Sequence, residues 1–184
     1  MSQHLREIDP EHFASPRLLL RKPCINDIAP AFALFSDPDT ARFNPAGPHR
    51  SMDETEAMVE RWIRQWEDHH FGSWIISLKE MPSEMIGFGG LSCKVIGETE
   101  RINLGYRFAT RVWGQGLATE LAQAALEYGF NTQGFPEIWA TARQDHAASR
   151  HILEKIGMQA VDTLTAAENL PSRVVYRLLR TPTA

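Results

Sequence analysis

The sequence has little of what several protein classes require. Only two of its 184 residues are cysteines, Cys24 and Cys93, so the disulfide framework of a small secreted protein is excluded. No apolar run approaches the roughly 18 residues of a membrane span, and residues 1–7 are too polar for a secretory signal. The net charge is only −4, without the basic character of a nucleic-acid binder. We therefore expect a cytoplasmic protein with no nucleic-acid and no membrane partner.

Metal-ligand patterns are missing as well. The chain holds no H-E-x-x-H and no C-x-x-C, the spacings typical of zinc sites. His69 and His70 are adjacent, so their side chains diverge on a helix and indicate a solvated helix end. We expect no metal.

What the chain does have is the composition of a folded domain, because 43% of its residues are hydrophobic and 23% charged. Its length favours a single domain over 1–184, of which about the first 15 residues form an arm. The patterning predicts a mixed α/β (α+β) fold around one sheet. The expected strands are 17–22, 71–79, 85–96, 101–108, 137–142, 160–164 and 173–179; the expected helices are 28–35, 51–66, 116–130 and 147–156.

Two helix starts carry capping residues. Asn26 and Asp27 precede the helix expected at 28–35, and Ser51 with Glu54 has the S-x-x-E form of a capping box. The intervening segment 36–50 holds three prolines and is expected to be a loop with at most one short helical turn.

The segment 111–120 connects an expected strand to an expected helix. Gly114 and Gly116 permit a tight turn and close approach of a ligand, while the helix start supplies unpaired amides and a positive dipole end. Such a junction suits a phosphate or pyrophosphate, and Arg111 could add a positive charge. The dinucleotide fingerprint fails because Thr119 stands at the third glycine position, and no G-K-[ST] of a P-loop is present. Taken alone, the two glycines favour a plain helix-capping turn.

Further motifs change that interpretation. Arg111-x-x-Gly114-x-Gly116 matches the R/Q-x-x-G-x-G/A acyl-coenzyme A signature of the GNAT superfamily of N-acetyltransferases. Segments 113–120 and 149–158 resemble the branch of ribosomal-protein alanine and serine N-terminal acetyltransferases. Leu104-Gly105-Tyr106 resembles the I-G-Y strand of that branch, and the likeness runs from about residue 16 to 180.

The resemblance implies a GNAT-like splayed, mostly antiparallel sheet flanked by helices, with acetyl-CoA as co-substrate in the gap. Its pyrophosphate is expected on the loop and helix start, and its pantetheine arm along the strand that ends at Phe108. A homodimer follows by family analogy alone. The implied cofactor-binding residues are Phe108, Arg111, Val112, Trp113, Gly114, Gln115, Gly116, Leu117, Ala118, Thr119, His146 and Ser149.

Three positions depart from the family pattern. His146 replaces an asparagine that touches the pantetheine, and is either a substitute contact or a tolerated exposed residue. Leu153 replaces a tyrosine general acid, which leaves Ser149 as the candidate to protonate the thiolate, against the alternative of a helix-capping hydroxyl. Asn103 replaces a glutamate base, and Tyr106 is favoured as structural. Ser149, Asn103 and Tyr106 nevertheless remain the candidate catalytic residues.

The resemblance implies direct attack of a primary amine on the acetyl thioester, without a covalent enzyme intermediate. At pH 7 an α-amine is about 14% neutral and a lysine amine only ~0.04%, so a site without an evident base favours an α-amine. The acceptor remains open among protein N-termini, amino-acid-like compounds, polyamines and antibiotic amines. We expect its pocket at the 36–50 loop, the following helix and the strands beyond. The alternative is a non-catalytic acyl-CoA-binding or sensing module.

Overall fold

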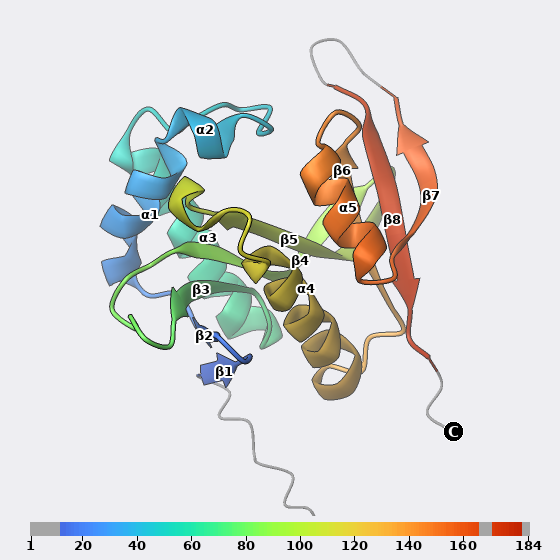
Figure 1. Ribbon diagram of the computed structural model, residues 1–184, viewed down its shortest axis with the longest axis horizontal. Coiled ribbons are helices and arrows are strands. Elements are labelled where there is room, and N and C mark those ends of the chain that lie inside the picture. The colour runs from blue at the N-terminus through green and yellow to red at the C-terminus, as the bar shows by residue number, and fades with distance from the viewer. Residues whose placement is uncertain (1–11, 166–170, 182–184) are drawn as a thin grey trace, which may run out of the picture.

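A computed structural model describes residues 12–165 and 171–181, and its strands form one sheet in the order β1-β2-β3-β4-β5-β6-β8-β7 (Figure 1). Neighbouring strands run antiparallel except β5 and β6, which are parallel. The predicted mixed fold with a mostly antiparallel sheet is confirmed. The strands are β1 (His12–Ala14), β2 (Leu18–Arg21), β3 (Ser73–Leu78), β4 (Gly87–Ile96), β5 (Thr99–Phe108), β6 (Glu137–Arg143), β7 (Gln159–Leu164) and β8 (Arg173–Leu179).

The helices also follow the predicted ranges closely. They are α1 (Ile28–Phe35), α2 (Pro38–Ala41), α3 (Met52–His69), α4 (Leu117–Glu127) and α5 (Ala147–Lys155), with 3-10 turns η1 (Ile25–Asp27) and η2 (Thr110–Val112). α4 stops short of the predicted residue 130, because the chain continues as a π-helical turn, η3 (Tyr128–Thr132). Within the described part of the chain, no helix is long and apolar enough to cross a membrane.

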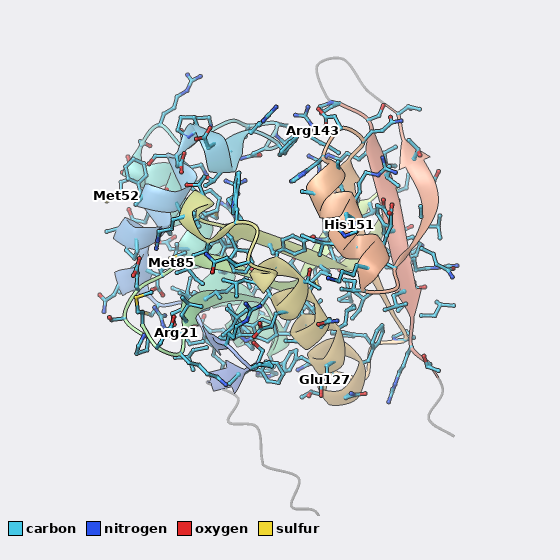
Figure 2. The ribbon with its side chains drawn as sticks, viewed as in Figure 1. Arg21, Met52, Met85, Glu127, Arg143 and His151 are labelled. Carbon is cyan, nitrogen blue, oxygen red and sulfur yellow. The ribbon has the colours of Figure 1, made fainter. Side chains whose placement is uncertain are left out.

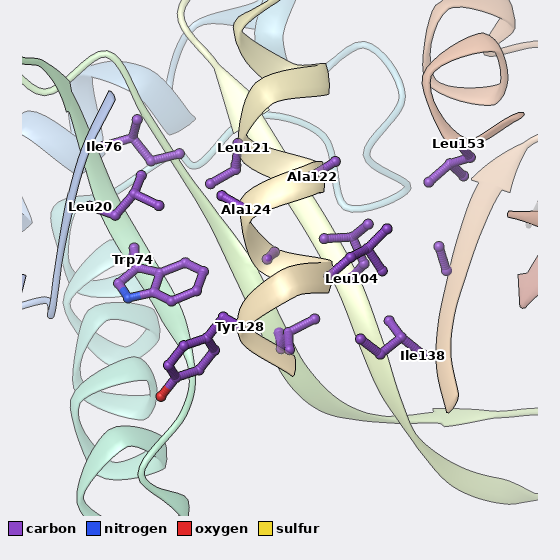
Figure 3. Packing of buried hydrophobic residues seen from close by; sticks show 14 of the residues in the cluster. Leu20, Trp74, Ile76, Leu104, Leu121, Ala122, Ala124, Tyr128, Ile138 and Leu153 are labelled. Carbon is purple, nitrogen blue, oxygen red and sulfur yellow. The ribbon is translucent and has the colours of Figure 1, made fainter. Parts of the chain in front are cut away.

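The main core lies between the sheet and α4. Leu121 of α4 is fully buried, as are Leu91 of β4 and Ile138 of β6, and Figure 3 shows Leu121, Leu104 and Ile138 in the same layer. Each such side chain stabilises the fold by about 1.5–3 kcal/mol on burial. On the opposite face of β4, Phe88 stacks on Phe35 of α1 at 4.8 Å. The sheet is therefore covered by α4 on one face and by α1 and α3 on the other.

The sheet splays between its two parallel strands. β5 and β6 pair only at Asn103 with Trp139 and at Leu104 with Ala140; no further pair joins them in the ranges the structure describes. Beyond these pairs β5 continues to Phe108 and β6 to Arg143. Ligands of open sheets bind where the carboxyl ends of neighbouring strands part in this way. The loop 111–119 follows β5, and the segment before α5 follows β6.

Some local expectations were wrong. The predicted arm includes β1, which pairs with β2, while residues 1–11 lie outside the described ranges. Asp27 does not cap α1, because its carboxylate binds Arg21 and the amide of Cys24. The Ser51 side chain makes no capping bond to α3; Glu54 Oε2 instead accepts from the amide of Arg50 at 3.1 Å. The carboxylates of Asp27 and Glu54 thus accept from nearby donors other than the amides that each helix start was expected to offer.

Candidate functional site

The loop before α4 has the backbone conformation that its glycines suggested. Gly114 and Gly116 have φ values of 75° and 77°, in the left-handed region that disfavours side chains. A Cβ added at Gly114 meets nothing within 4 Å, and one at Gly116 meets only Arg17 Nη2 at 3.7 Å. Glycine is needed here for its conformation rather than for lack of space.

This loop presents a row of free backbone donors. The first hydrogen bond of α4 runs from the amide of Glu120 to the carbonyl of Gly116 at 3.1 Å, so the amides of residues 117–119 precede the helical ladder. The amides of residues 114–116 take part in no hydrogen bond within the described ranges. Six consecutive amides at the positive end of a helix dipole fit a phosphate or pyrophosphate group.

A partly buried carboxylate, that of Glu120, holds the loop in place. Glu120 Oε1 accepts from Ser15 Oγ at 2.6 Å and from the amide of Arg17 at 2.7 Å, and Oε2 accepts from Arg17 Nε at 2.7 Å. Arg17 Nη1 in turn donates to the carbonyl of Gln115 at 2.9 Å. Although burial opposes it, these bonds lower the pKa of Glu120. The sequence reasoning missed Arg17 and Ser15, since they lie about 100 residues away along the chain.

Two motif side chains are engaged within the protein. Arg111 donates to Glu84 Oε1 at 2.5 Å and to the carbonyl of Met85 at 3.1 Å, so its charge is paired at the surface. Trp113 Nε1 donates to the carbonyl of Phe108 at 2.8 Å. Arg111 thus ties the loop to the connection between β3 and β4, and Trp113 folds the loop back onto the end of β5.

The edge of β5 that faces β6 carries further free backbone groups. The amide of Ala109 donates to the carbonyl of Ile86 at 2.8 Å, which fixes which residues of β5 face β4. Because backbone groups alternate along an antiparallel strand, the amides of Tyr106 and Phe108 point the other way, toward the splay. β6 does not pair with β5 at these positions. The edge can therefore accept an added extended segment.

The structure brings three of the predicted site residues together across the splay. The hydroxyl oxygens of Tyr106 and Ser149 lie 3.4 Å apart, although 43 residues separate them. The amide of Ser149 donates to His146 Nδ1 at 3.4 Å, so His146 caps α5. Burial raises the pKa of Tyr106 to about 12 and lowers that of His146, which keeps both side chains neutral at pH 7.

A ring contact closes this end of the splay. Phe43, which follows α2, stacks on His146 with ring centroids 3.7 Å apart. Arg143, labelled in Figure 2 beside the splay, lies with its guanidinium carbon 5.5 Å from the centroid of the Phe43 ring. The loop after α2 therefore contacts the segment before α5.

Asn103 does not join Tyr106 and Ser149. Residues three apart on a strand face opposite sides, so Asn103 lies on the α1 and α3 side of the sheet. The residue is only 6% exposed, and its Oδ1 has no hydrogen-bond partner among residues 12–165 and 171–181. This face adjoins the region expected for the acceptor, because Phe35 of α1 stacks both on Phe88 of β4 and on His49 of the 36–50 loop.

A groove of about 750 Å³ lies beside the start of α4. It is lined by Gly116 and Thr119 of the loop and by the basic residues Arg17, Lys79 and Lys155. Glu120 and Glu127 line it as well, and Glu120 pairs with Arg17, so acidic side chains balance most of this positive charge. No group of histidine, cysteine and acidic side chains suited to a metal ion is found in the described ranges.

Comparison with known proteins agrees with these features. Residues 17–159 match the family described as "Acetyltransferase (GNAT) domain". The protein YkkB of Bacillus subtilis (strain 168) is 32% identical over 149 residues, which cover 80% of this chain and 85% of YkkB.

Solved structures share the fold. An acetyltransferase (GNAT family) from Bacillus anthracis has a TM-score of 0.78 at 24% identity, covering 92% of this chain and 98% of that one. RimL, a ribosomal alpha-N-protein acetyltransferase in complex with coenzyme A, has a TM-score of 0.73 at 19% identity, covering 92% and 98%. Given the family match over most of its length, the chain belongs to the GNAT family and is an acetyl-CoA-dependent acetyltransferase.

Proposed function

We propose that this acetyltransferase acts on a primary amine, which attacks acetyl-CoA directly while both substrates are bound. The observation that carries the proposal is the junction after β5, where free amides of 114–119 adjoin an unpaired strand edge. The loop binds the pyrophosphate, and the edge at Tyr106 and Phe108 binds the pantetheine arm. The carbonyl of Phe108 already accepts a hydrogen bond from Trp113 Nε1, so at this residue the pantetheine arm pairs only with the backbone amide.

Acetyl-CoA supplies an activated acetyl group and a thiolate leaving group. The chain contributes proximity, because positioning two reactants together lowers a barrier by about 7–11 kcal/mol. A free amide of Tyr106 or Phe108 polarises the thioester carbonyl by hydrogen bonding.

Ser149 is the proposed proton donor to the leaving sulfur, and its hydroxyl regains a proton from the amine nitrogen, which becomes acidic once it has attacked the thioester. Its hydroxyl lies at the open ends of β5 and β6, near the phenol of Tyr106. Tyr106 positions this hydroxyl and stays protonated itself, since its pKa is raised to about 12. A thiol has an ordinary pKa of ~8.5, so the leaving group needs only modest help.

The acceptor is proposed to be an α-amine, on a protein N-terminus or a small molecule. Asn103 cannot act as a base, and an α-amine is far more often neutral at pH 7 than a lysine amine. The ribosomal-protein branch, the cytoplasmic location, the single domain and the homodimer remain predictions from the sequence.

Thermal unfolding with acetyl-CoA, CoA and NADH tests the proposal first. Ligand at about 100 times Kd adds roughly 2.7 kcal/mol, which raises the Tm of a domain of this size by about 5–10 °C. We expect that shift with acetyl-CoA and none with NADH. Release of free thiol from acetyl-CoA with a panel of amines then measures turnover. A shift without turnover on any amine would favour the non-catalytic module.

A further inference from the structure

Arg107 of β5 is a half-buried cation without a counterion. No side chain in the described ranges forms an ion pair or a hydrogen bond with it, and its Nη1 is buried without a partner. Its guanidinium carbon lies 4.6 Å from the ring centroid of Phe35 and 5.9 Å from that of Phe88. Ring contacts stabilise a cation but satisfy none of its planar N–H donors. Burial lowers the pKa of Arg107 to about 10, so it remains charged at pH 7.

The same face of β5 carries a second unsatisfied group and an open space. Asn103, Gly105 and Arg107 are every second residue of β5, so they lie on the same face, with about 6–7 Å from each to the next. A Cβ added at Gly105 meets only Asn103 Nδ2, at the ordinary contact distance of 3.5 Å. Asn103 Oδ1 is buried and has no partner in the part of the chain that the structure describes. Two polar side chains with unused hydrogen-bonding capacity therefore flank a position that bears no side chain.

Two further basic side chains, Lys94 and Arg101, lie on this face about 20 Å along the strand from Arg107. Lys94 of β4 pairs with Arg101 and therefore lies on the same face, and within the described residues its ammonium donates only to the neutral Thr141 Oγ1, at 3.1 Å. Arg101, by contrast, has a counterion, because its Nη1 donates to Glu137 Oε1 at 3.1 Å. At Arg107 itself, desolvation and its own unpaired charge disfavour a second cation and favour an anion.

The face also meets the region expected for the acceptor. Phe35, which contacts Arg107, stacks on His49 of the 36–50 loop at 4.6 Å. Asn103 occupies the position where related enzymes are expected to carry a base, so the reacting amine lies near it. Asn103 and Arg107 are four residues apart, about 13 Å along the strand, so a group several bonds from that amine can meet the long Arg107 side chain between them.

From these contacts we propose that the acceptor amine carries a carboxylate, and that Arg107 binds that carboxylate. A guanidinium matches a carboxylate with two parallel hydrogen bonds, which the unsatisfied Nη1 and its neighbour can supply. The inference rests on the proposed function and narrows its acceptor. Polyamines, which carry further positive charges, are excluded as acceptors, and amino-acid-like or peptide substrates with a free carboxylate are selected.

The test compares acceptors that differ only in this charge. Dipeptides with a free C-terminus and the same dipeptides with an amidated C-terminus serve as matched pairs in the thiol-release assay. For the wild type we expect a kcat/KM at least ~10-fold higher with the carboxylate, as for a hydrogen-bonded charged group. R107Q should reduce the preference to within about 3-fold, and R107K, which keeps the charge but not the planar fork, to an intermediate value. R101Q, on the same strand and face, should keep the full preference.

The acetyl-CoA thermal shift of every variant separates the two proposals. If acetyl-CoA raises the Tm of the wild type and the enzyme turns over both dipeptides of each pair equally, Arg107 does not bind the acceptor carboxylate, although the proposed acetyltransferase reaction stands. The absence of both shift and turnover overturns the proposed function and the inference together. A preference nearly lost in R107Q and reduced in R107K, at an unchanged shift, supports the inference, and R107K alone decides it where R107Q does not fold.

Discussion

Removal of the Glu120 carboxylate is expected to destabilise the protein and to loosen the loop 111–119. The carboxylate accepts three hydrogen bonds, from Ser15 Oγ, the amide of Arg17 and Arg17 Nε, and its side chain is 12% exposed. Hydrogen bonds to a charged group contribute about 1.5–3 kcal/mol each. The Arg17 side chain is 50% exposed, so its ion pair adds at most about 1 kcal/mol.

Allowing for water that enters the vacated site, we expect Glu120→Ala to lower the free energy of unfolding by about 2–4 kcal/mol. For a chain of this size that is a fall in Tm of about 5–15 °C. Arg17 then loses the partner that directs it at the carbonyl of Gln115, so the affinity for acetyl-CoA should also fall several-fold. Thermal and urea unfolding measure the first effect, and titration with acetyl-CoA measures the second.

The pH dependence gives an independent check. The folded-state pKa of Glu120 is lowered, so its contribution is fully present above the ordinary value of 4.5 and is lost as the pH falls through the folded pKa. The stability difference between wild type and Glu120→Gln should be constant from pH 7 to about pH 5 and shrink below. Glu56→Gln, at an exposed residue of α3, is the matched control and should change little. A Glu120→Ala stability within about 0.5 kcal/mol of wild type would refute the reasoning.

Three further predictions concern the predicted site. Ser149→Ala should lower kcat about 100-fold or more, as expected for loss of a general acid, whereas Tyr106→Phe should lower it less; equal effects would contradict the assigned roles. Gly114→Ala should cost about 1–2 kcal/mol in urea unfolding through its positive φ alone, since the added Cβ meets nothing within 4 Å. Burial lowers the pKa of His146 in the folded protein below the value of about 6.5 in the unfolded chain. As the pH falls below about 6.5, the unfolded chain therefore binds a proton on His146 before the folded protein does, and the free energy of unfolding declines. His146→Asn should remove that part of the decline in pH-dependent unfolding curves.

Much of the architecture was readable because it depends on near neighbours along the chain. The apolar spacing of α3 and α4 and the alternation of the strands predicted nearly every element to within a few residues. Gly114 and Gly116 predicted a tight turn before α4, and the structure places both glycines in the left-handed region. The strand alternation also held an unused signal, since Asn103 and Tyr106 are three residues apart and must face opposite sides of β5.

Contacts between distant segments could not be read in this way. The pairing of Arg17 with Glu120, the approach of Tyr106 to Ser149 and the isolation of Arg107 follow from strand order, register and helix placement. Acceptors also compete for the same donor, and Arg111 forms its ion pair with Glu84 of a different segment.

The sequence by itself therefore determined the elements, the resemblance to the family and the loop after β5, because short-range sterics and periodicity govern those features. Only the tertiary structure decided which side chains meet at the site, because long-range register and burial, not proximity in the chain, govern which donors and acceptors remain free.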